Sequence, residues 1–192
     1  MLSKTKSIRS LLDRGNPSDM ALNAPDRAPL SYAELTAHID KIAGQLASQG
    51  FGANDRIAII LPNGPEMATA FLAVSSYMSA APLNPSYTQT EYEFYLSDLK
   101  PKLVIVEQAS ENPVRAAAEK LSIPVVEAVV PNNAAAGLFD LFDKTSDISI
   151  PGETAEALVL HTSGTTSRPK VVPLTQANIV ASAENIAQTL KL

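Results

Sequence analysis

The chain has 192 residues, 45% hydrophobic and 18% charged, which is enough for a globular core and favours one domain over two small ones. Its net charge of −5, without any run of basic residues, excludes nucleic acid as the expected partner. The absence of cysteine excludes disulfide bonds, zinc sites with thiolate ligands and thiol catalysis.

The first part of the chain predicts two helices and a buried strand. Residues 1–15 lack the long apolar core of a secretory signal and predict a short surface helix. Ser31 and Glu34 have the spacing of a capping box, so a helix is expected to begin there and to end at Gly50. The continuous apolar run of residues 55–62 predicts a strand covered on both faces. The residues that share the apolar face of this helix are Leu35, Ile39, Ile42 and Leu46.

The middle of the chain continues this alternation. Its most apolar segment contains serines and is flanked by prolines, which favours a buried helix over a membrane span. Asn84 and Pro85 are interpreted as a turn that closes the sheet, and Thr88 with Glu91 repeats the capping spacing. The predicted elements are a helix over residues 65–79, an extended piece over 80–85, a helix over 92–100, a strand over 101–107, a helix over 112–121 and a strand over 123–130.

The last part begins less regularly. Residues 131–152 predict either a surface connection or a linker between subdomains, with one helical turn at residues 138–142. Residues 156–162 predict a strand, and residues 170–174 are extended again after a polar loop. Thr175 predicts the start of a final helix, in which one face carries Ile179, Ala183, Ile186 and Leu190.

Strands that alternate with helices predict an α/β fold, a layered sandwich in which helices flank a mostly parallel sheet. In such sheets ligands bind beyond the carboxyl ends of the strands. The polar loop of residues 162–170 follows one of these ends. We therefore expect the ligand site at this loop.

The chemistry of this loop suits a polyphosphate. Gly164 allows a ligand to approach the backbone closely, and consecutive N–H groups in a tight loop form an anion-binding concavity. Lys170 adds a mobile positive charge. A plain Ser/Thr-rich surface loop has the same composition, so the residues alone leave both interpretations open. The hydroxyl donors are Thr162, Ser163, Thr165, Thr166 and Ser167.

Other nucleotide and hydrolase motifs are absent from the sequence. A Walker motif requires glycine directly before the lysine, where Pro169 stands. The G-x-G of Gly50 and Gly52 is followed by Asp55 in place of the third glycine of a dinucleotide fingerprint. There is also no G-x-S-x-G elbow of a serine hydrolase.

The string TSGTTSRPK at residues 162–170 resembles the phosphate-loop signature of the adenylate-forming superfamily, which comprises acyl-CoA synthetases, adenylation domains and luciferases. The resemblance continues upstream through residues 30–107, so it covers most of the chain. His161 and Ser167, with the segments AAPLNPSYT and EFYLSD, are most similar to the oxalyl-CoA synthetase branch.

The resemblance implies an ATP-dependent reaction of a small-molecule carboxylate. The acid and ATP give an acyl-adenylate and pyrophosphate, and coenzyme A then takes the acyl group as a thioester. Lys170 would be a cation for the leaving pyrophosphate, and Mg²⁺ would enter with ATP, with Thr166 as its candidate protein contact. The resemblance carries the ATP phosphate contacts onto Thr162, Ser163, Gly164, Thr165, Thr166 and Ser167.

The two histidines have other expected roles. His161 adjoins the loop; a packed histidine that hydrogen-bonds backbone is the first interpretation, and a ligand contact is the second. His38 is expected on the surface. Ser167 and Val171 stand where the superfamily commonly has glycine, and Val171 would be strained if that position required a positive φ.

Members of the superfamily are much longer and carry further motifs downstream. We therefore expect residues 1–192 to be a partial, N-terminal AMP-binding domain that is inactive alone, with the C-terminal portion of the same enzyme as its missing partner. The alternative is a non-catalytic nucleotide- or partner-binding module. A serine hydrolase built on Ser163 and His161 is disfavoured, because these residues are too close in sequence and no triad acid is evident. A cytoplasmic or peroxisomal location is expected.

Overall fold

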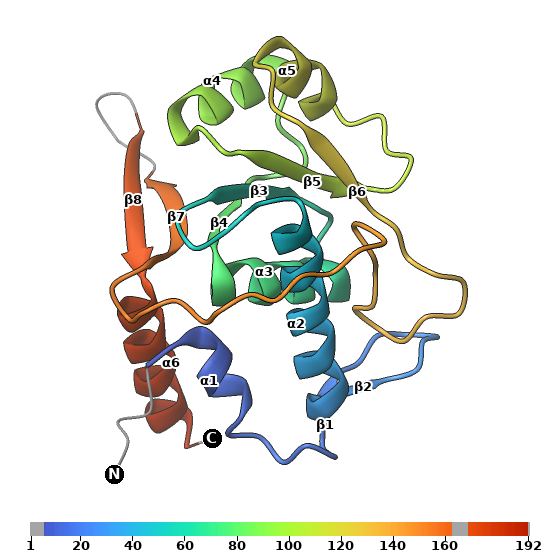
Figure 1. Cartoon of the computed structure of the whole chain (residues 1–192), viewed down its shortest axis with the longest axis vertical. Coiled ribbons are helices and arrows are strands. Elements are labelled where there is room, and N and C mark those ends of the chain that lie inside the picture. The colour runs from blue at the N-terminus through green and yellow to red at the C-terminus, as the bar shows by residue number, and fades with distance from the viewer. Residues whose placement is uncertain (1–5, 163–168, 192) are drawn as a thin grey trace.

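The computed structural model describes residues 6–162 and 169–191. Its main feature is a six-stranded sheet, in which every neighbouring pair of strands is parallel except the last. Helices cover both faces of this sheet (Figure 1), so the predicted α/β sandwich with a mostly parallel sheet is confirmed. The strand order is β6 (Val125–Ala128), β5 (Leu103–Glu107), β3 (Arg56–Ile60), β4 (Ser79–Pro82), β7 (Glu156–Thr162) and β8 (Lys170–Thr175).

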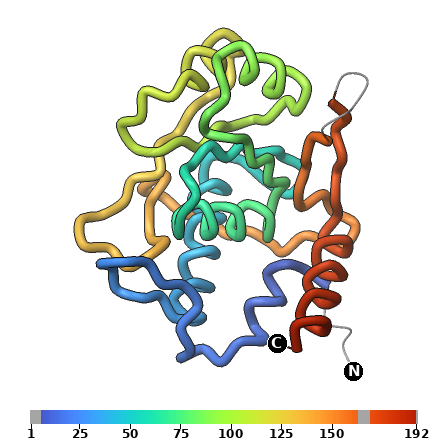
Figure 2. Tube along the Cα trace, turned by 180° about the vertical axis from the view of Figure 1, so that it is seen from behind, coloured from blue at the N-terminus to red at the C-terminus, as the bar shows by residue number. Residues whose placement is uncertain are grey.

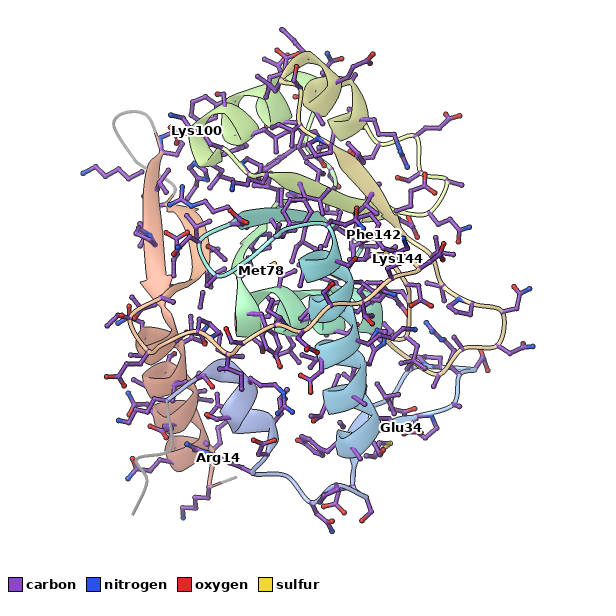
Figure 3. All side chains as sticks on the ribbon, viewed as in Figure 1. Arg14, Glu34, Met78, Lys100, Phe142 and Lys144 are labelled. Atoms are coloured by element: carbon purple, nitrogen blue, oxygen red, sulfur yellow. The ribbon has the colours of Figure 1, made fainter. Side chains whose placement is uncertain are left out.

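The helices divide between the two faces. α2 (Tyr32–Ser48) and α3 (Pro65–Tyr77) cover one face, and α4 (Gln89–Leu99) and α5 (Val114–Lys120) cover the other, as the views from the two sides show (Figure 1, Figure 2). Met78, which directly follows α3, has no exposed surface and lies in the interior of the molecule (Figure 3). The helix predicted over residues 65–79 therefore ends slightly early, and the following residues join the sheet.

The strand β3 shows why a continuous apolar run indicated a doubly covered strand. Ile57 and Ile59 pack in the core beneath α2 and α3, whereas Ala58 and Ile60 pack beneath α4 and α5. Side chains alternate between the faces of a strand, so a strand covered on both faces needs apolar residues at every position. All four of these residues are buried.

Both capping boxes predicted from the sequence are present. At the start of α2, Ser31 N donates to Glu34 Oε2 at 2.8 Å and Glu34 N donates to Ser31 Oγ at 3.3 Å. Thr88 and Glu91 make the same reciprocal pair at the start of α4. Gly50 follows α2 with a φ of 89°, a conformation that glycine adopts without strain. The apolar face of α2 is buried as predicted at Leu35, Ile39, Ile42 and Leu46.

The remaining elements lie at the α2–α3 side of the sheet. They include a small antiparallel pair, β1 (Met20–Leu22) and β2 (Leu30–Ser31), which the sequence analysis did not foresee. α1 (Ile8–Leu12) and α6 (Gln176–Leu190) lie side by side (Figure 1). The apolar face expected on α6 is covered only near its start, because Ile186 and Leu190 are exposed.

Two expectations for the α2 region were wrong. Residues 138–142 form no helical turn; instead Val129 and Asp140 pair as an antiparallel bridge. His38 is not on the surface, since only 6% of it is exposed and the N–H of Phe139 approaches its Nε2 at 3.4 Å. Both errors have one cause: the segment after β6 folds back over α2 and buries Phe139 and Leu141 there.

None of the described helices combines the length and apolar character that crossing a bilayer requires. This agrees with the interpretation of the apolar segment of α3 as a buried helix, since Ala70, Ala73 and Val74 are completely buried.

Candidate functional site

The predicted loop begins at the carboxyl end of a parallel strand. β7 runs parallel to β4, through the pair Ala80 and Leu158, so Thr162 ends β7 at the edge of the sheet where the other parallel strands also end. The chain returns at Lys170 as β8, and β7 with β8 forms a hairpin at one side of the sheet (Figure 1). This is the edge at which α/β sheets bind ligands.

The structure describes three of the predicted site residues, His161, Thr162 and Lys170. Thr162 and Lys170 are cross-strand partners in the β7–β8 ladder, and both are exposed. Residues paired in this way carry their side chains on the same face. A hydroxyl donor and an ammonium group therefore stand next to each other where the loop begins and ends. The other predicted contacts, Ser163, Gly164, Thr165, Thr166 and Ser167, lie outside the described residues.

Val171 is accommodated without backbone strain. It lies in β8 opposite His161, in an extended strand conformation that a β-branched residue favours. The condition under which this valine would be strained, a positive φ, does not arise. Lys170 is consequently held in the regular ladder of the hairpin.

His161 is a packed histidine, and its described partner is a carboxylate rather than backbone. Its Nε2 lies 3.0 Å from Asp98 Oδ2 of α4, and only 8% of its side chain is exposed. The ring of Tyr95 meets the imidazole edge-on, with 4.8 Å between centroids. Because an ionised carboxylate only accepts hydrogen bonds, Nε2 carries a proton and donates. Asp98 is 63 positions away from His161 in the sequence, and no local pattern around it predicts this contact.

Tyr95 also belongs to a group of aromatic residues from α4 and the segment before it. Tyr87 stacks on Tyr95 with ring centroids 4.8 Å apart, and burial raises the pKa of Tyr87 to about 12. The hydroxyl of Tyr92 donates to the backbone oxygen of Asn84 at 2.9 Å. Asn84 itself accepts from the N–H of Ser86, so the turn predicted at Asn84 is present.

Another depression lies at the same edge of the sheet, beyond β3, β5 and β6. It has a volume of about 200 Å³, and its lining includes Gly64, Glu66, Glu107 and Val130. Its two carboxylates make it a poorer phosphate site than the end of the β7–β8 hairpin. Within residues 6–162 and 169–191, no cluster of three or more acidic or histidine side chains is arranged to hold a metal ion.

Comparisons with known proteins find CoA ligases similar to most of the chain. The chain is 42% identical over 172 residues to a probable CoA ligase, CCL9, of Humulus lupulus. The matched region covers 85% of this chain and 32% of that protein. It is 39% identical over 183 residues to the oxalate–CoA ligase of Arabidopsis thaliana, covering 92% and 36% respectively. The chain thus spans about a third of the length of these curated relatives.

Solved structures agree with the fold. Apo MatB from Rhodopseudomonas palustris superposes with a TM-score of 0.79 at 23% identity, over 98% of this chain and 38% of that one. The o-succinylbenzoate CoA synthetase MenE of Bacillus subtilis, solved with its acyl-adenylate intermediate, superposes with a TM-score of 0.75 at 26% identity, over 96% of this chain and 46% of that one. A family model described as AMP-binding enzyme matches residues 13–192, and the chain therefore belongs to the family of AMP-binding enzymes.

Proposed function

We propose that residues 1–192 are the N-terminal part of an ATP-dependent acyl-CoA ligase and contribute its ATP-phosphate-binding loop. The observation that carries this proposal is the pairing of Thr162 with Lys170 at the carboxyl edge of the sheet, where the hydroxyl-rich loop begins and ends. In the whole enzyme a carboxylate reacts with ATP to give an acyl-adenylate and pyrophosphate. Coenzyme A then takes the acyl group as a thioester.

The donor set of the loop fits a triphosphate. In this proposal the hydroxyls and N–H groups of residues 162–167 bind the β- and γ-phosphates, and Lys170 balances the charge of the departing pyrophosphate. Mg²⁺ binds phosphate oxygens and needs few protein ligands, so it would arrive with ATP, with the hydroxyl of Thr166 as one contact. The contribution of this chain is binding and electrostatic positioning.

The acid that we propose is oxalate. The Arabidopsis relative and one from Saccharomyces cerevisiae, which is 34% identical over 165 residues, are both named oxalate–CoA ligase. A cytoplasmic or peroxisomal location accords with this proposal.

We also propose that these residues do not complete adenylation alone, since they correspond to about a third of the length of the curated relatives. The chain then binds MgATP weakly, with a Kd on the order of 1 mM, because phosphate contacts are only part of what holds a nucleotide. A titration of the ¹⁵N-labelled chain with MgATP, followed by NMR, tests this. We expect the shift changes to concentrate at residues 161–171.

Variants make the titration specific. Lys170→Met should weaken MgATP binding about tenfold, whereas Lys120→Met, which removes an exposed lysine of α5, should leave it unchanged. A pyrophosphate assay with oxalate, coenzyme A and MgATP should detect no turnover. Shift changes spread evenly over the surface, or equal binding by the two variants, would refute the phosphate-loop assignment.

A second candidate is a non-catalytic module that binds a nucleotide or a partner. The exposed apolar side chains of Ile186 and Leu190 on α6 favour it, because such residues are commonly covered by a partner. Micromolar or tighter MgATP binding by the isolated chain, without turnover, would favour this module over the ligase part.

A further inference from the structure

We propose that Asp98 positions the phosphate-binding loop through its hydrogen bond to His161. The inference concerns how the loop is held in place, and it rests on the proposed function because the loop's ligand is taken to be MgATP. Asp98 acts through His161 and is thus a positioning residue, not a group that touches the nucleotide.

The hairpin that carries the loop is weakly joined to the sheet by backbone pairing. The register between β4 and β7 consists of one pair, Ala80 and Leu158. After Leu158, the backbone partners of β7 in the described ladder are all residues of β8. The end of the hairpin is therefore held against the rest of the molecule by side chains.

Those side chains lie on the face of the hairpin toward α4. Val159 and Val171 pack with Leu99, which ends α4. His161 lies two residues after Val159 and so shares this face. Its imidazole reaches Asp98 at 3.0 Å, and the pair adds a directional polar contact to an otherwise apolar junction.

The environment of His161 fixes its ring. The side chain is almost fully enclosed, the edge of the ring meets Tyr95, and Nε2 is committed as a donor to the carboxylate. Thr162 follows directly and pairs with Lys170. Fixing His161 on α4 therefore also holds Thr162 and Lys170, the described residues at the two ends of the loop.

The location of Asp98 supports a role beyond helix stability. It is the second-last residue of α4, where the helix dipole disfavours negative charge. An acid at that end weakens the helix slightly, and the contact with His161 contributes to offsetting this cost. Acids elsewhere on α4 have ordinary surface roles; Glu93, for example, pairs with Lys120.

The test compares the unaltered chain with Asp98→Ala, which removes the acceptor, and His161→Phe, which keeps the packed ring but removes the donor. Asp98→Asn is the conservative variant, because its amide oxygen still accepts from Nε2. Glu93→Ala is the matched control, an acid of the same helix that contacts α5. Each protein is titrated with MgATP by NMR, and its amide hydrogen exchange is measured without nucleotide.

We expect Asp98→Ala and His161→Phe each to weaken MgATP binding about fivefold, and the double variant to be no weaker than either single one, because both remove the same contact. Asp98→Asn should retain most of the affinity, and Glu93→Ala should retain all of it. Amide exchange should accelerate at residues 159–162 and 170–174 in the first two variants only, and not in β3 or β5.

The outcomes separate this inference from the proposed function. The positioning role would be overturned if Asp98→Ala and His161→Phe left the MgATP affinity unchanged. It would also be overturned if the losses of affinity in the two variants simply added in the double variant. If the unaltered chain shows no MgATP binding, the proposed function fails, and amide exchange then decides alone. Faster exchange confined to the hairpin in both variants supports the positioning role, and unchanged exchange rejects it. Should Asp98→Ala not fold, His161→Phe still measures the loss of the contact, and Asp98→Asn and Glu93→Ala are the variants expected to retain the affinity.

Discussion

Arg56 and Glu156 form a two-point ion pair that joins β3 to the start of β7 across the intervening β4. Arg56 Nε lies 2.7 Å from Glu156 Oε1, and Nη2 lies 2.9 Å from Oε2. Ser79 of β4 also donates to Glu156 Oε1, at 2.6 Å. One carboxylate thus links three adjacent strands at the edge of the sheet opposite the loop.

Replacing this carboxylate should destabilise the fold in a pH-dependent way. The hydrogen bond from Arg56 is the main cause that lowers the pKa of Glu156 below its ordinary value of 4.5. A carboxylate with a lowered folded pKa stabilises the fold above its unfolded pKa, and this contribution is lost as the pH falls through the folded value. Glu156→Gln should therefore reduce the free energy of unfolding by about 1–3 kcal/mol at pH 7. Urea denaturation at several pH values measures this.

The control for that experiment is Glu184→Gln, which removes a more exposed ion pair with Arg14. Exposed pairs contribute little, so a change below about 1 kcal/mol is expected. If the difference in the free energy of unfolding between wild type and Glu156→Gln stayed constant from pH 7 to well below 4.5, the ionisation of Glu156 would not contribute to stability as described.

His38 should make the fold sensitive to mild acid. Burial lowers its pKa from 6.5 to about 4, and the charge of Lys41 acts in the same direction. As the pH falls from 6.5 toward 4, the unfolded chain binds a proton that the folded chain does not, so stability decreases over this window. The loss attributable to His38 approaches about 3 kcal/mol near the lower end. Thermal unfolding of His38→Gln and of wild type at several pH values measures this loss. If the stability of the two proteins changed with pH in the same way, His38 would not be its source.

Gln176 should be a strong stabilising residue although it is polar. Its Oε1 accepts from Ile8 N at 2.9 Å, and its Nε2 donates to the backbone oxygen of Ser75 at 2.6 Å. It is completely buried, so Gln176→Ala leaves two buried backbone groups without partners. We expect a loss of about 1–3 kcal/mol in the free energy of unfolding. Gln188→Ala, at an exposed position of the same helix, should cost less than about 0.5 kcal/mol, and equal effects would refute the prediction.

Phe139 tests the packing of the irregular segment on α2. Only 1% of it is exposed, and it lies in the main core, in edge contact with His38. Phe139→Ala should cost about 3–5 kcal/mol, because it leaves a cavity the size of the ring. Phe142→Ala, three positions later and only partly buried, should cost clearly less in the same chemical denaturation series. If the two variants are equally stable, residues 131–152 do not pack as described.

The elements that were predicted correctly have signals within a few neighbouring residues. Ser31 and Glu34 indicate the start of a helix because their reciprocal hydrogen bonds join residues only three positions apart. The apolar run of β3 reports burial because every side chain faces one of the two cores. The position of the hydroxyl-rich loop after a parallel strand also followed from local order alone.

The errors concern contacts between distant segments. The burial of His38 depends on residues near Phe139, which is 101 positions away in the sequence. The residues next to His38 give no indication of this contact. In the sequence, Asp98 cannot be distinguished from an acid on the surface of a helix. Its contact with His161 exists only because the fold brings α4 next to β7. The roles of Ser163 and Thr166 in binding phosphate remain predictions, since those residues lie outside the described part of the chain.

The edge position of β8 has a consequence for how copies of this chain meet. Pro173 interrupts the strand with a residue that has no N–H, and prolines in sheets occupy the side of an edge strand that faces away from the ladder. A second chain that approached β8 would therefore find a missing donor halfway along. Pro173 therefore disfavours the addition of a strand from another molecule at this edge of the sheet.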